Sequence, residues 1–382
     1  MKAIVCGSMN CSTVDYVSAM EDLHNQVFTI HPDRYIHSTD PDLYTADCRH
    51  YELVVMVILV VLTSALGVAG NALTLVALCA STQRSVTVFL LTALAVSDIV
   101  FLLVVSTLLA LPAACRSLGS CHSDIQGALQ LLDQYGWAVA SMTHVANVYI
   151  TVLVTVHRYI SVCLPHEARI RSTFHKAKCQ LTAIILFSIV YNIPRFFEFQ
   201  DYGESGPSRG NSTTDPAVVP VRTLSKVGDN FWYQLLYKNI AFYLLVFIIP
   251  LGTLTVLSYK LFKALEVHRR KRDKLLFTLH QRKEDNTTFA LVVIVVIFLL
   301  CQTPTMFQRL MYALVRTDGQ KCGHFFFYLQ GCADYLAIVN SSANFVVYVL
   351  FSRHFRTQLW LKISGKVISN TKKTNANTLL LR

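Results

Sequence analysis

Long runs without a charged side chain are the feature of this sequence that most restricts its fold. The clearest run is Leu53–Ala80, which spans 28 residues without Asp, Glu, Lys or Arg. A helix rises ~1.5 Å per residue and the hydrocarbon core of a bilayer is ~30 Å thick, so this run is long enough to cross a membrane. Because the bilayer core offers no water to the backbone, the run is predicted to be helical.

Six further apolar stretches are spaced along the chain, and each predicts another membrane helix. A hydrophobic content of 53%, with 15% charged residues and a mean hydropathy of +0.44, is too apolar for a soluble protein of this length. The predicted fold is therefore an all-α membrane protein, a bundle of seven transmembrane helices. The six stretches are Val86–Pro112, Gln134–Pro165, Cys179–Pro194, Asn239–Tyr259, Asn286–Leu314 and Phe325–Phe351.

The basic residues predict the orientation of the bundle. With the N-terminus outside, 22 of the 34 Lys and Arg residues face the cytosol and 12 face outward, as the positive-inside rule requires. The net charge of +11 is therefore assigned to the membrane rather than to nucleic acid. Three parts are predicted: an extracellular tail (1–52), the seven-helix domain (53–351), and a short interfacial helix with a cytoplasmic tail (352–382).

The outer side is expected to carry sugars and disulfides. Asn10 and Asn211 begin Asn-x-Ser/Thr acceptor sites in predicted extracellular segments. The first residues lack an apolar core of secretory length, so the first membrane helix is expected to direct insertion. Some of the outer cysteines are expected to pair, although their connectivity does not follow from the sequence. These are Cys6, Cys11, Cys48, Cys115, Cys121, Cys322 and Cys332.

Asp98 is the acidic residue predicted to lie deepest in the membrane. A carboxylate at that depth costs ~2.5 kcal/mol or more unless it faces the bundle interior and finds partners. No lysine or arginine is predicted at the same depth, so amides, hydroxyls, water or a cation are the expected partners. A protonated Asp98 in a hydrogen-bonded network without an ion is the open alternative. The candidate partners are Asn71, Asn147, Asn340, Ser341 and Asn344.

The stretch Gln134–Pro165 ends in His157-Arg158-Tyr159. In one interpretation Arg158 is a membrane anchor whose head group reaches the interface. However, VYITVLVTVHRYISVCLP also resembles the end of the third helix in rhodopsin-class (class A) G-protein-coupled receptors, where an acidic residue precedes Arg-Tyr. That resemblance implies that Arg158 holds the inactive state and later contacts the G protein. His157 replaces the acidic residue, which makes it a candidate pH-sensitive group.

Two later stretches resemble the same family. The run FLLCQTP, ending at Pro304, is similar to Phe-x-x-Cys-Trp-x-Pro, with Gln302 in place of tryptophan. The run from Asn344 to Tyr348 is similar to Asn-Pro-x-x-Tyr, with Phe345 in place of proline. The proline leaves a carbonyl unpaired and predicts a hinge in the sixth helix.

The motif YNIPRFFE, residues 191–198, is familiar from invertebrate FMRFamide-type neuropeptide receptors. The resemblance covers about 53–361. It implies a plasma-membrane receptor for an Arg-Phe-amide peptide that signals through heterotrimeric G proteins, with kinases and arrestin at the tail and lipid around the bundle. It also implies that Glu284, 20 residues before Pro304, pairs with Arg158, and that a sodium ion is held beside Asp98. No other cofactor is expected.

The expected peptide needs a carboxylate for its guanidinium and aromatic walls for its ring. Asp133 and Asp334 are the predicted carboxylates at the outer ends of the third and seventh helices, and Arg309 is the predicted resting partner of Asp334. The remaining candidate ligand residues are Trp137, His144, Gln302, Tyr312 and Tyr335.

Some features of the sequence depart from the family or argue against other classes of protein. The family joins the top of the third helix to the following outer loop by a disulfide, but Asp133 occupies the first position and that loop has no cysteine. A biogenic-amine receptor would carry a carboxylate at position 140, where this chain has Ala140. A retinal protein would need a lysine in the seventh helix, and none lies between Lys321 and Lys362, so the sequence argues against both classes. No motif for hydrolytic or kinase chemistry is present. Another peptide, a small transmitter, or a multi-helix transporter stay as alternatives.

Overall fold

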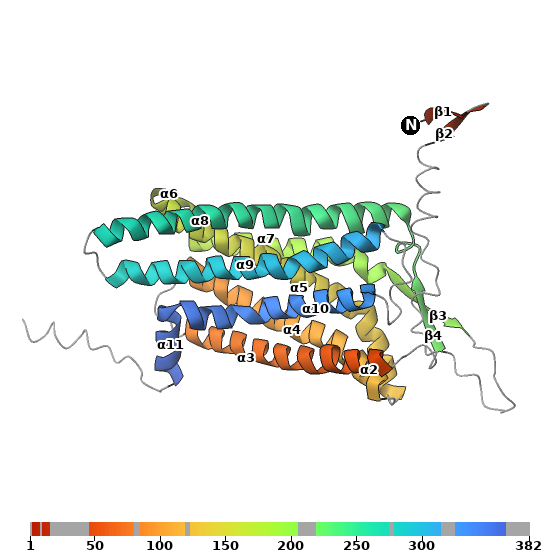
Figure 1. Ribbon diagram of the computed structural model, residues 1–382, viewed down its shortest axis with the longest axis horizontal. Coiled ribbons are helices and arrows are strands. Elements are labelled where there is room, and N and C mark those ends of the chain that lie inside the picture. Colours follow the sequence, from red (N-terminus) through yellow and green to blue (C-terminus); the bar gives the residue numbers. More distant parts are fainter. Residues whose placement is uncertain are drawn as a thin grey trace, which may run out of the picture.

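Long helices that run alongside one another make up the body of the molecule (Figure 1). The computed structural model describes residues 2–7, 10–15, 46–79, 85–118, 123–204, 219–274, 279–314 and 325–363. The membrane-length elements are α3 (Val60–Cys79), α4 (Val86–Leu118), α5 (Ser123–Cys163), α7 (Phe174–Asn192), α8 (Ile249–Lys274), α9 (Leu279–Leu314) and α10 (Phe325–Phe351).

Shorter helical segments extend or connect these helices. The first helix is continuous from α2 (Ala46–Tyr51) through the π-helical η2 (Glu52–Leu59) into α3, and the fifth runs through the π-helical η4 (Tyr233–Ala241) and η5 (Tyr243–Ile248) into α8. The connecting helix α6 (Pro165–Arg171), the 3₁₀ segment η3 (Ile193–Phe197) and the terminal helix α11 (Arg353–Ile363) complete the set.

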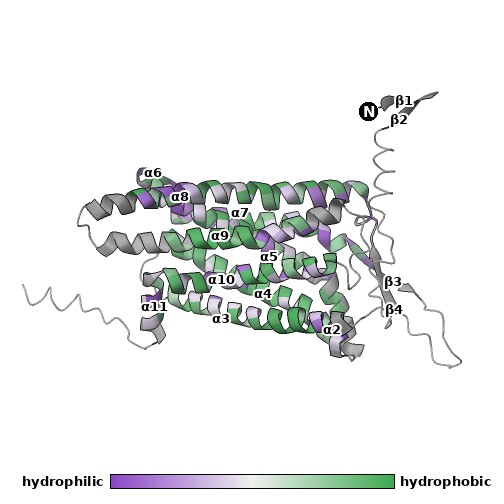
Figure 2. Cartoon of the chain, viewed as in Figure 1, coloured by the Kyte–Doolittle hydropathy of each residue, from purple (hydrophilic) through white to green (hydrophobic). Residues whose placement is uncertain are grey.

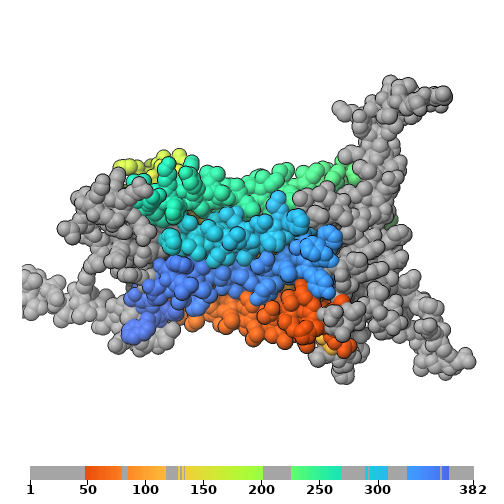
Figure 3. Space-filling view, in the orientation of Figure 1, coloured from red at the N-terminus to blue at the C-terminus, as the bar shows by residue number. Residues whose placement is uncertain are grey.

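The predicted seven-helix bundle is confirmed. Six described helical segments are long and apolar enough to cross a membrane, and a shorter apolar segment, Val292–Gln308, lies within α9. Apolar residues dominate the middle of each helix, and polar residues gather toward the ends (Figure 2). In the space-filling view, α8, α9, α10 and α3 lie side by side across one face (Figure 3).

Most helices are longer than the charge-free runs that predicted them. The first helix begins at Ala46, inside the predicted tail, and the fourth begins at Phe174 rather than at Cys179. The length of a charge-free run indicates only the part of a helix that lies inside the hydrocarbon core. The helix itself continues into water as long as capping and side-chain contacts stabilise it. Thr173 provides such a cap, since its side chain accepts a hydrogen bond from Lys176 N.

Two β-hairpins were not predicted from the sequence. Strand β1 (Lys2–Gly7) pairs antiparallel with β2 (Asn10–Asp15), within the predicted extracellular tail. Strand β3 (Phe199–Glu204) pairs with β4 (Val219–Leu224), within the predicted outer loop. Figure 1 shows the β3–β4 hairpin at the same end of the bundle as α2, opposite the end that carries α6 and α11.

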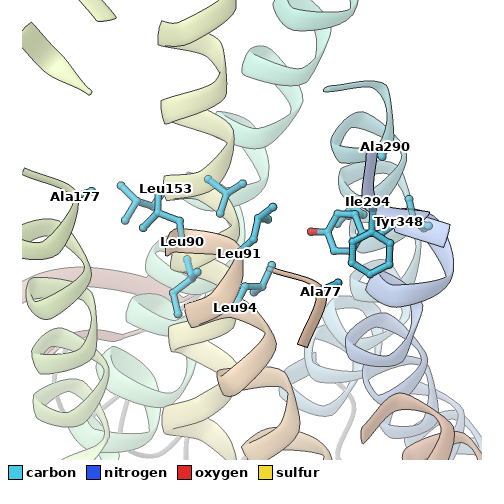
Figure 4. Packing of buried hydrophobic residues seen from close by; sticks show 13 residues of the cluster. Ala77, Leu90, Leu91, Leu94, Leu153, Ala177, Ala290, Ile294 and Tyr348 are labelled. Carbon is cyan, nitrogen blue, oxygen red and sulfur yellow. The ribbon is translucent and has the colours of Figure 1, made fainter. Parts of the chain in front are cut away.

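A cluster of buried apolar side chains fills the half of the bundle nearer α6 and α11 (Figure 4). It joins Leu90, Leu91 and Leu94 of α4 to Leu153 of α5 and Ile294 of α9, all of them 7% exposed or less. Phe355 also enters this cluster, and its burial fixes α11 against the end of α10.

A close approach between the first and seventh helices depends on glycine. A Cβ added to Gly70 would lie 2.8 Å from the Phe345 ring and Cβ. Phe345 is the residue that replaces the proline expected in the seventh helix, so the absence of a side chain at Gly70 makes room for a larger one at Phe345.

Disulfide formation on the outer side is confirmed for two of the seven cysteines named above. Cys48 and Cys115 are both disulfide-bonded. Cys332 is a free, exposed thiol. Asn10 is the first residue of β2, and Asn211 lies outside the described residues.

Candidate functional site

Asp98 lies in the interior of the bundle, where three helices meet. Its side chain is 2% exposed, and both carboxylate oxygens accept hydrogen bonds from amides. Asn147 of α5 donates to Oδ1 at 3.0 Å, and Asn344 of α10 donates to Oδ2 at 2.7 Å. The predicted grouping of Asp98 with amides from the third and seventh helices is therefore present in the structure.

The first helix contributes a further amide to this polar cluster. Asn71 of α3 is 1% exposed and donates to the backbone oxygen of Ser341 at 3.0 Å. Ser341 is itself buried beside the Asp98 carboxylate. Asn340 is only half-buried, and no hydrogen bond among the described residues joins it to Asp98.

Two buried oxygens in the cluster have no hydrogen-bond partner among the described residues. They are Oδ1 of Asn71 and Oδ1 of Asn147, each on a side chain whose nitrogen is already used. A buried polar atom without a partner costs about 1–3 kcal/mol. The cluster therefore combines one carboxylate with uncommitted amide oxygens, a set of ligands suited to a hard cation such as sodium.

His157 is buried near the C-terminal end of α5. Its side chain is 2% exposed, and both ring nitrogens have partners: Nδ1 lies 2.8 Å from Ser172 Oγ, and Nε2 lies 2.9 Å from Gln180 Oε1. Because an amide oxygen only accepts, Nε2 carries the proton, and in a neutral ring Nδ1 accepts from the serine hydroxyl. His157 thus joins α5 to the segment between α6 and α7 through Ser172, and to α7 itself through Gln180.

Arg158 follows His157 but faces another part of the bundle. Its guanidinium and the Asp98 carboxylate both act electrostatically on the hydroxyl of Tyr348, a residue of α10 that is 4% exposed. Tyr159 is half-buried, with Lys260 Nζ 6.0 Å from its ring centroid. The side chain of Glu284 lies outside the described residues, so its pairing with Arg158 stays a prediction.

The sixth helix continues through its proline. Pro304 lies within α9, which ends only at Leu314. Because proline has no N–H, the helix loses one backbone hydrogen bond there. The neighbouring Thr303 hydroxyl donates to Leu299 O at 2.8 Å, and Gln302 is 2% exposed in the bundle. Burial of Gln302 thus packs α9 against the bundle beside the predicted hinge at Pro304.

The predicted ligand residues on the third helix lie near its outer half. Trp137 is 36% exposed. The ring centroid of His144 lies 5.9 Å from that of Phe101 in α4, so this histidine faces the second helix. The side chain of Asp133 lies outside the described residues, as do those of Arg309 and Tyr312 on the sixth helix.

The predicted ligand residues on the seventh helix face the first helix. Asp334 is half-buried and acts electrostatically on the Tyr51 hydroxyl. The Tyr335 hydroxyl lies 3.1 Å from Thr63 Oγ1. The structure therefore places both residues on the side of α10 that meets the first helix.

Two buried ion pairs at the outer end were not predicted from the sequence. Glu52 of η2 accepts from Arg116 of α4, with Nε 3.1 Å from both carboxylate oxygens and an Nη nitrogen 2.9 Å from one of them. Glu198, at the end of YNIPRFFE, is paired with Lys238 of η4. Both glutamate side chains are 5% exposed. The only sequence signal was the presence of acids at the ends of apolar runs.

Comparison with protein families gives a match over most of the chain. The family model described as 7 transmembrane receptor (rhodopsin family) matches residues 70–348. This region includes the Asp98 cluster, the His157-Arg158-Tyr159 sequence and the seventh helix.

Individual relatives are similar at low identity. The "FMRFamide receptor" of Drosophila melanogaster is 25% identical over 299 residues, which cover 78% of this chain and 52% of that protein. The "FMRFamide peptide receptor frpr-18" of Caenorhabditis elegans is 22% identical over 243 residues, 63% and 54% of the two chains. "Neuromedin-U receptor 2" of Mus musculus is 25% identical over 332 residues, 85% and 79%. The chain spans about half the length of the first two relatives.

Proposed function

Because the chain belongs to the rhodopsin family of seven-transmembrane receptors, we propose that it is a plasma-membrane receptor that binds an extracellular neuropeptide and signals through a heterotrimeric G protein. It is a receptor rather than an enzyme. The observation that carries the peptide assignment is that the similar proteins include receptors named for FMRFamide and for neuromedin-U. The alternatives are another peptide or a small transmitter.

The more specific proposal is a peptide that ends in Arg-Phe-amide. Such a ligand presents a guanidinium, an aromatic ring and an amide, so it needs a carboxylate beside aromatic side chains. Asp334 is half-buried near Tyr51 and is followed by Tyr335, which supplies these groups at the outer part of α10. Asp334 is therefore the proposed partner of the peptide arginine.

The inner end of the bundle supports the signalling part of the proposal. The Arg158 guanidinium, on α5, acts electrostatically on the buried Tyr348 hydroxyl of α10. His157 holds the adjacent α6–α7 segment through Ser172 and Gln180. A movement of α9 or α10 would therefore change the surroundings of Arg158 while the α6–α7 segment stays attached to α5. Kinases and arrestin are the proposed partners of the tail beyond α11.

A sodium ion is proposed beside Asp98. The carboxylate would supply the charge, and the unpartnered oxygens of Asn71 and Asn147 would supply neutral ligands after small rotations of their amides. An ion bound there would favour the arrangement in which α3, α4, α5 and α10 lie close together. Ligands that bind one state better than another shift the equilibrium by the difference in their affinities.

A screen against a peptide library tests the proposed function. Cells that express the chain together with a calcium or second-messenger reporter are treated with amidated Arg-Phe peptides, other neuropeptides and small transmitters. The proposal expects a response to Arg-Phe-amide peptides at concentrations that leave untransfected cells silent. A response to peptides of another class alone would limit the conclusion to a peptide receptor, and a response to small transmitters alone would contradict the proposal.

A further inference from the structure

The motif YNIPRFFE ends at Glu198, a buried acid that the proposed function leaves without a role. Glu198 lies between η3 and β3 and is 4% exposed. One carboxylate oxygen is paired with Lys238 Nζ, and the other accepts from the Tyr233 hydroxyl at 3.3 Å. Both partners belong to η4, so this one side chain joins the end of the fourth helix to the start of the fifth.

The same residue closes the base of the β3–β4 hairpin. The backbone oxygen of Glu198 accepts from Ser225 N at 3.0 Å. The Ser225 hydroxyl donates to the backbone oxygen of Phe197 and also accepts from Val227 N and Gly228 N, both at 3.2 Å. The residue before the hairpin and the residue after it are thus held together at one point, next to the ion pair.

Further contacts hold the helical segments that precede and follow the hairpin. Asn230 Oδ1 accepts from Trp232 N at 2.9 Å and from Tyr233 N at 3.2 Å, which positions the start of the fifth helix. The Tyr237 hydroxyl donates to Tyr191 O at 2.6 Å, which ties η4 to α7.

One of the aromatic residues of the motif extends these contacts to the third helix. Phe196 stacks on Tyr135 of α5, with ring centroids 6.2 Å apart. Through these contacts the segment around Glu198 meets α5, α7 and η4. The hairpin from Phe199 to Leu224 contains no cysteine, so contacts of this kind, rather than a disulfide within the hairpin, hold it in place.

We propose that Glu198 is a positioning residue for ligand binding: its pairing with Lys238 and Tyr233 holds the β3–β4 hairpin in one position at the outer end of the bundle. The hairpin then forms a fixed wall beside the ligand entrance. The ligand part of this inference rests on the proposed function, whereas the holding of the hairpin does not. A buried carboxylate without its cation is unfavourable, so Glu198 requires Lys238.

Hydrogen–deuterium exchange on the full chain in lipid nanodiscs tests the positioning directly. Glu198→Gln keeps the shape of the side chain but removes its charge. We expect amides in Phe199–Glu204 and Val219–Leu224 to exchange at least tenfold faster in this variant, while amides in α4 exchange as in the parent. The charge-swapped double variant Glu198→Lys/Lys238→Glu should restore at least part of the protection. An unchanged hairpin in Glu198→Gln would overturn the proposal.

A matched control separates positioning from a general loss of stability. Glu52→Gln removes the other buried outer carboxylate and should leave exchange in the β3–β4 hairpin unchanged; an equal increase there would overturn the specific role of Glu198. If Glu198→Gln does not fold, Ser225→Ala serves instead, because it cuts the hairpin base without leaving a buried charge unpaired. Ser225→Ala is then expected to raise hairpin exchange at least tenfold, and no increase would overturn the proposal.

The ligand arm uses an Arg-Phe-amide peptide as the probe. The wall is expected to slow peptide escape, so Glu198→Gln should dissociate the peptide at least fivefold faster than the parent and Glu52→Gln should not. Equal dissociation rates from parent and Glu198→Gln, together with faster hairpin exchange, would overturn the link to ligand binding. A parent chain that binds no such peptide would contradict the proposed function, while the exchange experiment would still decide the role of Glu198.

Discussion

Buried carboxylates have different partners at the outer end of the bundle and at its centre. Glu52 and Glu198, at the outer end, are each paired with a cation: Arg116 and Lys238. Asp98, at the centre, is 2% exposed and receives hydrogen bonds from the amides of Asn147 and Asn344. No lysine or arginine side chain among the described residues is paired with it.

The difference separates structural from switchable charges. An ion pair is complete in itself, so Glu52 and Glu198 have little to gain from an added ligand. A carboxylate with neutral partners has no opposite charge beside it in a poorly solvated place, so an added cation or proton stabilises it most there. The outer pairs therefore hold helices together, whereas the central acid is where we propose that binding of an ion or a proton changes the state of the bundle.

The largest effect is expected from Lys238→Met. This variant leaves Glu198 buried without its cation, and breaking a buried pair on one side costs about 3–5 kcal/mol. Because the Lys238 side chain is 25% exposed, water reaches the site and we expect a loss below this range, about 2–3 kcal/mol. Thermal unfolding of the purified chain in nanodiscs measures it, and an unfolding temperature equal to the parent's would show that the pair is not structural.

Arg116→Met is expected to have a smaller effect on stability. Arg116 makes more hydrogen bonds to its acid than Lys238 does, but its side chain is 36% exposed. Solvent screening weakens exposed pairs to about 0.2–1 kcal/mol, so we expect a loss of about 1 kcal/mol. The same unfolding assay applies. A loss larger than that of Lys238→Met would show that hydrogen-bond geometry, rather than exposure, sets the strength of these pairs.

The predicted Arg158–Glu284 pair tests whether a charge pair can also hold the inactive state. Opposite charges on Arg158 and Glu284 would favour the closed state by about 1 kcal/mol. Glu284→Ala should therefore raise basal G-protein signalling several-fold, measured in cells with equal surface expression. Unchanged basal signalling at matched expression would remove Glu284 from the switch.

The smallest change in stability is expected at the centre. Asp98→Asn removes the buried charge, which offsets the loss of one hydrogen-bond acceptor, so the free energy of unfolding without sodium should change by less than about 1 kcal/mol. The parent should unfold at a higher temperature in sodium chloride than in choline chloride, whereas Asp98→Asn should unfold equally in both. A parent that is insensitive to sodium would favour the protonated network instead.

The fold could be predicted from the sequence because the membrane sets a length scale for apolar runs. The helices that cross it followed from stretches such as Leu53–Ala80, but their ends did not, because caps and aqueous contacts decide where a helix stops. The β3–β4 hairpin was not predicted, since its strands are short and their partners lie far along the chain.

The candidate site could be predicted only in part. A carboxylate in mid-membrane must find polar partners, so the grouping of Asp98 with Asn147 and Asn344 followed from the sequence. The partners of His157 did not, because they depend on the path of the chain at Ser172 and on how α7 is rotated about its axis. The Glu198–Lys238 pair also depends on tertiary structure, as its members are 40 residues apart.

The most direct test of the central claim compares two changes that remove the same charged contact. In cells that express the receptor, an Arg-Phe-amide peptide is compared with its citrulline analogue, on the parent and on Asp334→Ala, with Asp229→Ala as a control for an exposed outer carboxylate. We expect Asp334→Ala to weaken the arginine peptide at least tenfold, about 1.4 kcal/mol, without loss of surface expression. The citrulline analogue should then lose little further potency. Losses that simply add would show that Asp334 does not bind the peptide arginine, and an unresponsive parent would contradict the account as a whole.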